Sequence, residues 1–217
     1  MQQTSRPLQA VAVALAALAG YVDAVAFLDV GGFFVSFMSG NSTRFGVGLA
    51  GQTSAAATAG GLIGCFVLGV VFGSLVVQTS GRRRRPMVLI LVMLLLAWAA
   101  LIRIAVFPSQ PLIGALFLAM AMGAANATFE RDGEVAFGVT YMTGALVKTG
   151  HRIARALRGG PPLDWLPYLL LWSGLAGGAW SGALVYGRIG PSAILPAVIA
   201  SIILCGTVFW LDRHELT

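Results

Sequence analysis

The sequence contains few charged residues. Only 10% of its 217 residues are Asp, Glu, Lys or Arg, whereas 58% are hydrophobic and the mean hydropathy is +0.86. An average soluble domain has about 25% charged residues. So few charges cannot cover a soluble surface, so the natural solvent of this chain is lipid. The composition predicts an all-α integral membrane protein, a single transmembrane domain over 1–217 with the lipid bilayer as its first partner.

Residue types that carry catalysis, metal binding or disulfide bonds are also scarce. The two cysteines, Cys65 and Cys205, both lie in apolar runs, and the chain has only two histidines. None of the CxxC, HExxH, GxSxG or P-loop patterns occurs. Ser39 has no histidine in an apolar run that could act as its base. We therefore expect no enzyme activity, no metal site and no cofactor.

The net charge of +6 depends largely on one run of arginines at 82–85, which lies between two apolar segments. Such a run is typical of a cytoplasmic loop, because positive residues are retained on that side of the membrane. A nucleic-acid patch is the weaker interpretation, so we expect no nucleic-acid partner. Attraction to anionic lipid headgroups is a further alternative for the same run.

Six apolar runs are long enough, or nearly long enough, to cross a bilayer as helices. Proline, glycine or the arginine run separates most of them. The runs lie at roughly 8–30, 55–78, 87–107, 111–128, 165–187 and 190–211. The first run begins like a signal peptide but continues past Asp23 to Val30, so we expect an uncleaved helix.

Two further segments, 34–51 and 137–156, are more polar and contain glycine. If both cross the membrane there are eight spans, and the arginine run then lies outside. If both only enter and return, the run and the cations of 148–158 lie inside. Charge bias therefore predicts six spans, with both termini cytoplasmic. Whether the two segments are re-entrant, interfacial or fully spanning stays open at this point.

The two polar segments also repeat. Met38-Ser39-Gly40 matches Met142-Thr143-Gly144 about 104 residues later, and Asp23 corresponds to Asn126 at about the same offset. An odd number of spans per copy gives the copies opposite orientations. We predict two inverted three-helix repeats, about 8–107 and 111–211, each with a broken or re-entrant segment. Such interrupted segments at matching positions indicate a transport site.

Asp23 is the first candidate functional residue because it lies inside an apolar run. A carboxylate in hydrocarbon costs several kcal/mol, so it should face the protein interior or water. We expect it to couple transport to a proton or cation, or to pair with a buried cation such as Arg44 or Arg103. A solvated aspartate at a helix end is the alternative, and it fits Asp29 better. Asn126 would supply uncharged hydrogen bonds on the opposite side.

The polar segments supply the other candidates. Gly40 permits a tight backbone, and Ser39 or Asn41 could cap a helix whose positive end points inward. Thr143 and Gly144 are their counterparts in the second copy. Such a helix end suits an anionic or strongly polar ligand. The alternative is an ordinary extracellular loop with a short amphipathic helix.

The second segment continues with cations at helical spacing, Lys148, Arg152 and Arg155, which form one basic face. This pattern predicts an interfacial amphipathic helix. The alternative is that Lys148 reaches an anionic substrate.

Glycines spaced by four residues let helices approach closely. Two such sets occur, one in the third segment of each copy, and we interpret them as packing devices within the chain or between subunits. They are Gly69 and Gly73, and Gly174, Gly178 and Gly182.

The stretches "GYVDAVAFLDVGGFFVSFMSGNSTRFGVGLA" (20–50) and "TYMTGALVKTGHRIARAL" (140–157) resemble the YoaK-like family. The family is usually described as six-helix proteins of the bacterial inner membrane with a domain of unknown function. Ser39 stands where that family would have threonine. The resemblance implies a bacterial plasma-membrane location but no substrate.

A weaker resemblance links "GSLVVQTSGRRRRP" (73–86) to the loop between the second and third helices of major-facilitator transporters. This chain is half their length and lacks the acidic residue expected there. A homodimer would restore the full size. We therefore expect a small secondary transporter of a polar or anionic small molecule, coupled to a proton or cation. The alternatives are a non-transporting scaffold or sensor, and a channel.

Overall fold

The computed structural model describes residues 6–131, 134–135 and 141–214. Eight α-helices make up most of these residues. The α-helices are α1 (Arg6–Asp29), α2 (Met38–Leu49), α3 (Thr53–Thr79), α4 (Arg84–Leu101), α5 (Pro111–Asn126), α6 (Met142–Leu157), α7 (Leu166–Ile189) and α8 (Ile194–His214). The shorter elements are the 3-10 turns η1 (Gly81–Arg83), η3 (Ala127–Phe129) and η4 (Gly190–Ala193), the π-helical turn η2 (Ile102–Val106), and the antiparallel two-residue strands β1 (Glu130–Arg131) and β2 (Glu134–Val135).

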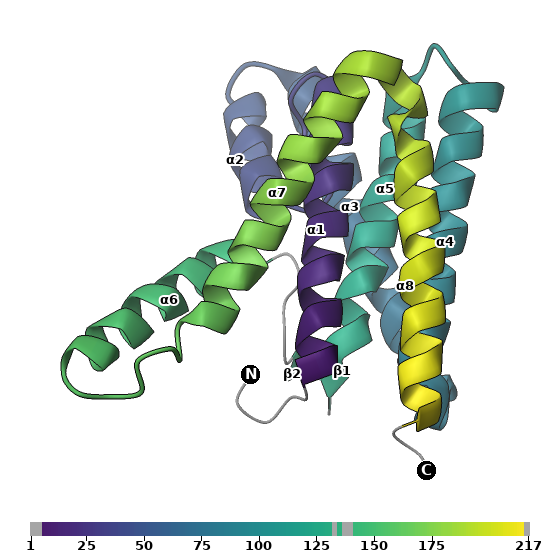
Figure 1. Cartoon of the computed structure of the whole chain (residues 1–217). Helices are drawn as coiled ribbons and strands as arrows, with labels where there is room; N and C mark the ends of the chain where they lie inside the picture. The colour runs from purple at the N-terminus through teal and green to yellow at the C-terminus, as the bar shows by residue number, and fades with distance from the viewer. Residues whose placement is uncertain (1–5, 132–133, 136–140, 215–217) are drawn as a thin grey trace.

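Within the described residues, five stretches are long and apolar enough to cross a membrane, and they cover all six runs expected from the sequence. They are Pro7–Asp29, Thr53–Thr79, Arg84–Val106, Pro111–Phe129 and Leu166–Arg213. The last stretch has 48 residues and contains two helices, α7 and α8, which turn back on each other at η4 (Figure 1). The all-α membrane architecture is therefore confirmed.

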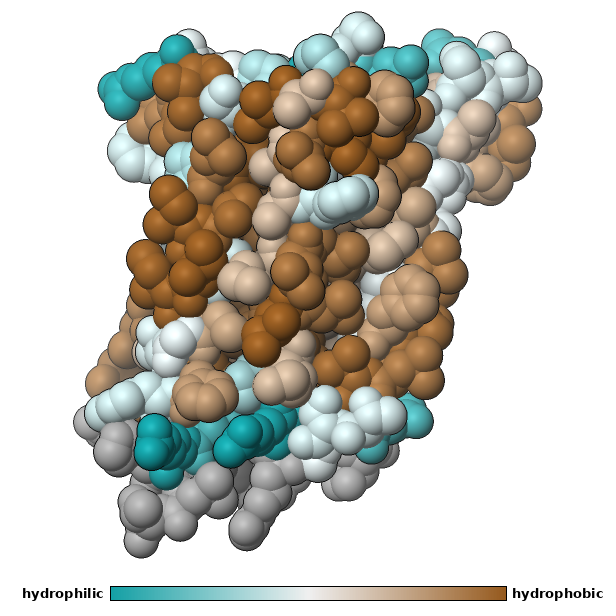
Figure 2. Space-filling model, turned by 90° about the vertical axis from the view of Figure 1, so that its right-hand side faces the viewer, coloured by the Kyte–Doolittle hydropathy of each residue, from teal (hydrophilic) through white to brown (hydrophobic). Residues whose placement is uncertain are grey.

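Apolar side chains cover the outside of the bundle. On the face shown in Figure 2, a broad hydrophobic band crosses the middle of the molecule, and hydrophilic residues gather toward its two ends. Within this band, α5 is the most enclosed span, and α1 is next. Their residues are hydrophobic almost all round, which is typical of a helix surrounded by other helices. The interior of the bundle is therefore built around α1 and α5.

Glycine permits the closest helix contacts, as the spacing predicted. A Cβ on Gly178 of α7 would overlap the backbone carbonyl of Ala17 in α1, and one on Gly20 of α1 would overlap that of Leu175. The α3–α5 pair has the same arrangement, in which Gly69 faces the backbone of Met120. Both glycine sets therefore pack within the chain, between α1 and α7 and between α3 and α5.

Helices α2 and α6, which begin with the two repeated motifs, lie on the same side of the bundle and begin at a similar level (Figure 1). From there α2 rises to the start of α3, at the end of the molecule opposite to the termini. In contrast, α6 descends outward, toward the end where both termini lie. The segment before α2 enters the bundle, where Val35 and Ser36 are buried, and α2 then leads back toward the end at which α1 finishes (Figure 1). The residues 137–140 of the second predicted segment lie outside the described part of the chain.

Candidate functional site

The segment that leads into α2 is held by side chains of two helices. At the end of α1, Gly31 and Gly32 have positive φ values of 74° and 96°, which lets the chain reverse direction. The buried carboxylate of Asp23 then accepts hydrogen bonds at Oδ1 from the backbone N–H groups of Val35, at 2.7 Å, and Ser36, at 2.9 Å. Asp23 thereby satisfies backbone groups that have no helical partner.

Asn41 of α2 holds the same segment from the other side. Its Oδ1 accepts the N–H of Phe34 at 3.0 Å, and its Nδ2 donates to the Phe34 carbonyl at 2.6 Å. The side chain thus pairs with Phe34 as a neighbouring strand would, and Asn41 is completely buried. Its amide groups are occupied by the backbone, which gives Asn41 a positioning role.

Three aromatic rings form a cluster beside this segment. Phe27 and Phe34 are 5.0 Å apart between ring centroids, and Phe34 and Phe37 are 5.2 Å apart in an edge-to-face arrangement. Gly40 lies directly under the cluster, since a Cβ there would be 2.6 Å from the Phe37 ring. The absence of a side chain at Gly40 therefore allows the rings to close over the first turn of α2.

The beginnings of α2 and α6 meet at a small pocket of about 190 Å³. Its lining comes from both repeated motifs and one residue of α3: Ser36, Phe37, Met38, Ser39, Phe66, Tyr141, Met142, Thr143 and Gly144. The residues that precede the two helices, Phe37 and Tyr141, make no side-chain cap hydrogen bond. The N–H groups of a first helical turn have no acceptor one turn earlier in the helix. In α2 the N–H groups of Met38 and Gly40 donate instead to the carbonyls of Ser36 and Phe37, so backbone satisfies much of this helix start.

The cap predicted at Ser39 or Asn41 is wrong. Helix α2 begins at Met38, so both residues lie inside its first turn rather than before it. Ser39 lines the small pocket, and Asn41 bonds back to Phe34. The sequence placed the cap two to four residues too late, because the hydrophobic Phe37 is an unusual residue in front of a helix.

A larger pocket of about 490 Å³ adjoins the small one, and the two share Ser36, Phe37, Met142 and Thr143. It lies between α1, α6, α7 and the segment before α2. Its other lining residues are Gly20, Asp23, Ala24, Phe27, Phe34, Leu146, Trp172, Leu175 and Ala179. Asp23 and Thr143, predicted from the two repeats, are therefore brought together at one cavity.

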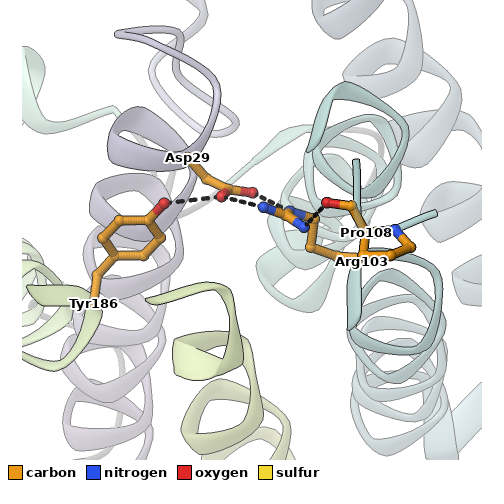
Figure 3. A network of polar contacts seen from close by, with 4 residues as sticks. All are labelled: Asp29, Arg103, Pro108 and Tyr186. Atoms are coloured by element: carbon orange, nitrogen blue, oxygen red, sulfur yellow. Dashed lines mark hydrogen bonds and ion pairs between the residues drawn. The ribbon is translucent and has the colours of Figure 1, made fainter. Parts of the chain in front are cut away.

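Arg103 pairs with Asp29 rather than Asp23, which corrects the charge partner expected for it. Arg103 Nε is 2.6 Å from Oδ2 of Asp29, and Nη2 is 2.9 Å from Oδ1. Tyr186 of α7 donates to Oδ1 of Asp29 at 2.9 Å, and Arg103 also donates to the carbonyl of Pro108 (Figure 3). The expectation of a solvated Asp29 is also wrong, since only 7% of its side chain is exposed.

The other two cations lie away from Asp23 as well. Arg44 stacks over the ring of Phe33, 4.9 Å from its centroid. Lys148 is exposed, and its Nζ lies 5.7 Å from the centre of the Tyr168 ring at the start of α7. In the described part of the chain, the polar contacts that the structure gives Asp23 come from backbone N–H groups and the Ser36 hydroxyl. Neither Arg44 nor Lys148 is its charge partner.

Asn126 occupies the last position of α5 and is buried, with 4% of its surface exposed. Its Nδ2 donates to the carbonyl of Met122 at 2.9 Å. It lines neither of the two pockets, whereas Gly144 lines the small one. The structure therefore places Asp23, Ser39, Thr143 and Gly144 around the connected cavity and leaves Asn126 apart from it.

The aromatic lining was missed by sequence reasoning. Phe27, Phe34 and Trp172 are ordinary residues in an apolar chain, so nothing in the pattern distinguishes them from lipid-facing aromatics. A signal existed only for Phe27, which lies four residues after Asp23 and therefore on the same helix face. No group of three or more His, Cys, Asp or Glu side chains that could hold a metal occurs among the described residues.

The long apolar helices, the hydrophobic band and the enclosed polar segment define a multi-pass helical transmembrane protein. The chain belongs to the family described as "Protein of unknown function (DUF1275)", which matches residues 11–207. It is also 35% identical, over 94% of this chain and 88% of the relative, to the "UPF0700 transmembrane protein RA0705" of Rhizobium meliloti (strain 1021). No solved structure matches the chain. The family resemblance inferred from the sequence is confirmed.

Proposed function

We propose that this protein is a small secondary transporter of a polar small molecule in the bacterial inner membrane. One observation carries the proposal: the beginnings of two short helices, one from each motif, meet at a cavity that also contains the buried carboxylate of Asp23. Broken helices with inward-facing starts are typical of substrate sites in secondary transporters.

Six crossings, with both termini cytoplasmic, fit the helix lengths and charges. Helix α2 has 12 residues and spans about 18 Å, too short for a bilayer core of about 30 Å. Both ends of the chain lie at the same end of the bundle (Figure 1). Arg85 is paired with Asp212 of α8 at 3.2 Å, so the arginine run also belongs to that end. Its accumulation of positive charge supports a cytoplasmic assignment.

The glycine contacts support the inverted repeat. Gly20 of α1 meets the backbone of Leu175 in α7, and Gly123 of α5, about 103 residues after Gly20, meets Phe66 in α3. In the same way Gly178 meets Ala17, and Gly69 meets Met120, which again is about 103 residues after Ala17. The first helix of each unit thus packs in the same manner on the helix that follows the short helix of the other unit, α1 on α7 and α5 on α3.

The glycine contacts also bear on the scaffold alternative. That alternative depends on glycine faces that are available to another subunit or protein. Gly69, Gly73, Gly174, Gly178 and Gly182 instead pack against backbone or side chains of the same chain. These contacts weaken the part of the scaffold argument that uses the glycine faces, and they leave the part that uses the arginine run at 82–85 as it was.

Cysteine accessibility tests the proposal. Ser39→Cys and Thr143→Cys are introduced after Cys65 and Cys205 are replaced by alanine, with the exposed Gln52→Cys as the control for the outer side. In a transporter that exposes its cavity alternately, we expect membrane-impermeant thiol reagents to reach both cavity positions from either side, and more slowly than Gln52→Cys. Labelling of Ser39→Cys only from outside and of Thr143→Cys only from inside, each as fast as an exposed control, would contradict transport.

A further inference from the structure

The charge of Asp23 has no compensating cation at the cavity. Among the described residues that line the larger pocket, Asp23 is the only charged one. The cations that the sequence offered as its partners pair elsewhere: Arg103 with Asp29, and Arg44 with the ring of Phe33. Backbone N–H groups stabilise the carboxylate, but they are neutral and leave its net charge in place. Buried charges are normally paired, so the cavity favours a partner of opposite sign.

The remaining lining suits an organic cation. Phe27, Phe34 and Phe37 form the ring cluster, and Trp172 lies across the same pocket, 37% exposed. Aromatic faces attract ammonium groups, and the same rings accept an apolar body. A pocket of about 490 Å³ is within the range that small ligands occupy. The combination of one carboxylate and several rings recognises an amine, whereas it would repel a carboxylate.

We infer that the larger pocket binds an organic cation, an amine with an apolar or aromatic body, with Asp23 as its charge partner. This inference rests on the proposed transport function and names its substrate class. It also explains the difference between the two motifs: Asp23 carries the charge, and its counterpart Asn126 is neutral and lies away from the pocket. An anion at the helix starts of the adjoining small pocket is the competing assignment, and the experiment separates the two.

The experiment compares three probes of similar shape on the purified full chain in lipid nanodiscs: 2-phenylethylamine, 2-phenylethanol and 3-phenylpropanoate. Calorimetric binding is measured at neutral pH. We expect the amine to bind about tenfold more tightly than the alcohol, and the anion to bind weakest. In Asp23→Asn the amine should lose this advantage, while alcohol binding should change less than about threefold. Asp212→Asn, an acidic residue outside the pocket, is the matched control and should retain the preference.

A second variant separates loss of binding from loss of structure, because Asp23 also accepts hydrogen bonds from the backbone of Val35 and Ser36. Trp172→Leu leaves those hydrogen bonds intact and removes a ring. We expect it to lower the ratio of amine to alcohol affinity by about threefold or more. An equal ratio in wild type and Trp172→Leu, tightest binding of 3-phenylpropanoate, or no binding of any probe each overturns the organic-cation inference. Thiol accessibility of Ser39→Cys and Thr143→Cys is independent of these probes, so transport itself is judged separately.

Discussion

Asn41 shows how a single buried amide can fix a non-helical segment. It is completely buried and makes two hydrogen bonds with the backbone of Phe34. In a membrane interior, water cannot replace these partners. A neighbouring residue, Ser42, bonds only to the carbonyl of Met38 within its own helix and is exposed. The two residues therefore differ in what their removal leaves unsatisfied.

We expect Asn41→Ala to destabilise the protein by about 2–4 kcal/mol, because it leaves a buried N–H and a buried C=O of Phe34 unpaired. Ser42→Ala should change stability by less than about 0.5 kcal/mol. Unfolding in detergent, followed by circular dichroism against denaturant, measures both. Equal stability of the two variants would show that Asn41 does not hold the segment.

At the scale of residues, the sequence drew attention to the polar side chains inside the apolar chain, but it did not reveal the groups that these side chains contact. A carboxylate at Asp23 and an amide at Asn41 are conspicuous because the surrounding residues are apolar. Their partners are backbone groups of Val35, Ser36 and Phe34, and a backbone group leaves no mark in a sequence pattern. Asp29 was misassigned for a related reason, because position near a helix end does not reveal a tertiary partner 74 residues away.

At the scale of helices, the Asp29 network joins three elements. Asp29 ends α1, Arg103 lies in the π-helical turn η2 after α4, and Tyr186 lies near the end of α7 (Figure 3). The carboxylate is bonded to Arg103 at two oxygens and to the hydroxyl of Tyr186. We expect this network to hold α1, α4 and α7 together at the end of the bundle opposite to the termini.

Arg103→Gln should cost about 3–5 kcal/mol, because it leaves the carboxylate of Asp29 buried without a cation. The double variant Asp29→Asn with Arg103→Gln removes both charges and should recover more than half of that loss. Thermal unfolding of the single and double variants in detergent measures the difference. Additive losses in the double variant would contradict an ion pair between these residues.

The glycine contacts provide a second prediction at the scale of helices, which concerns the packing of α1 against α7. Gly178→Ala places a methyl group against the backbone carbonyl of Ala17, whereas Gly177→Ala, the adjacent residue, meets nothing within 4 Å. Backbone cannot rotate away as a side chain can, so α1 and α7 must separate. We expect a loss of about 1–3 kcal/mol for Gly178→Ala and almost none for Gly177→Ala, measured by thermal unfolding and size-exclusion chromatography. Similar behaviour of the two variants would refute close α1–α7 packing.

The helix pattern itself was largely predictable from the sequence. Apolar runs separated by proline, glycine and arginine located the long helices, because a bilayer demands about 20 apolar residues per crossing. The spacing of glycines also indicated close helix contacts. Which helices pair could not be predicted, because the glycines of α7 fit against α1 only through the surface shape of both helices. The start of α2 was misplaced for a local reason, since Phe37 provides no capping side chain.

At the scale of the whole molecule, the path of 34–51 determines the orientation of everything that follows it. If α2 returns to the side from which the segment entered, the loop near Gly81 lies on the same side as both termini. If that segment instead crosses completely, the sides of all later loops are reversed relative to the N-terminus. The packing of Arg85 against Asp212 of α8 supports the first arrangement, because it places the arginine run beside the C-terminal end.

Reporter fusions test this arrangement directly. A fluorescent protein that folds only in the cytoplasm, and a phosphatase that is active only outside, are each fused after Gln52, Gly81, Ser109 and the C-terminus. We expect phosphatase activity after Gln52 and Ser109, and fluorescence after Gly81 and at the C-terminus, since α2 returns and α3, α4 and the later helices then alternate. Insertion of a charged pair into α2 should leave this pattern unchanged, because α2 does not have to cross the bilayer. Fluorescence after Gln52 together with phosphatase activity after Gly81 would mean that 34–51 crosses, and the re-entrant cavity on which transport depends would then be excluded.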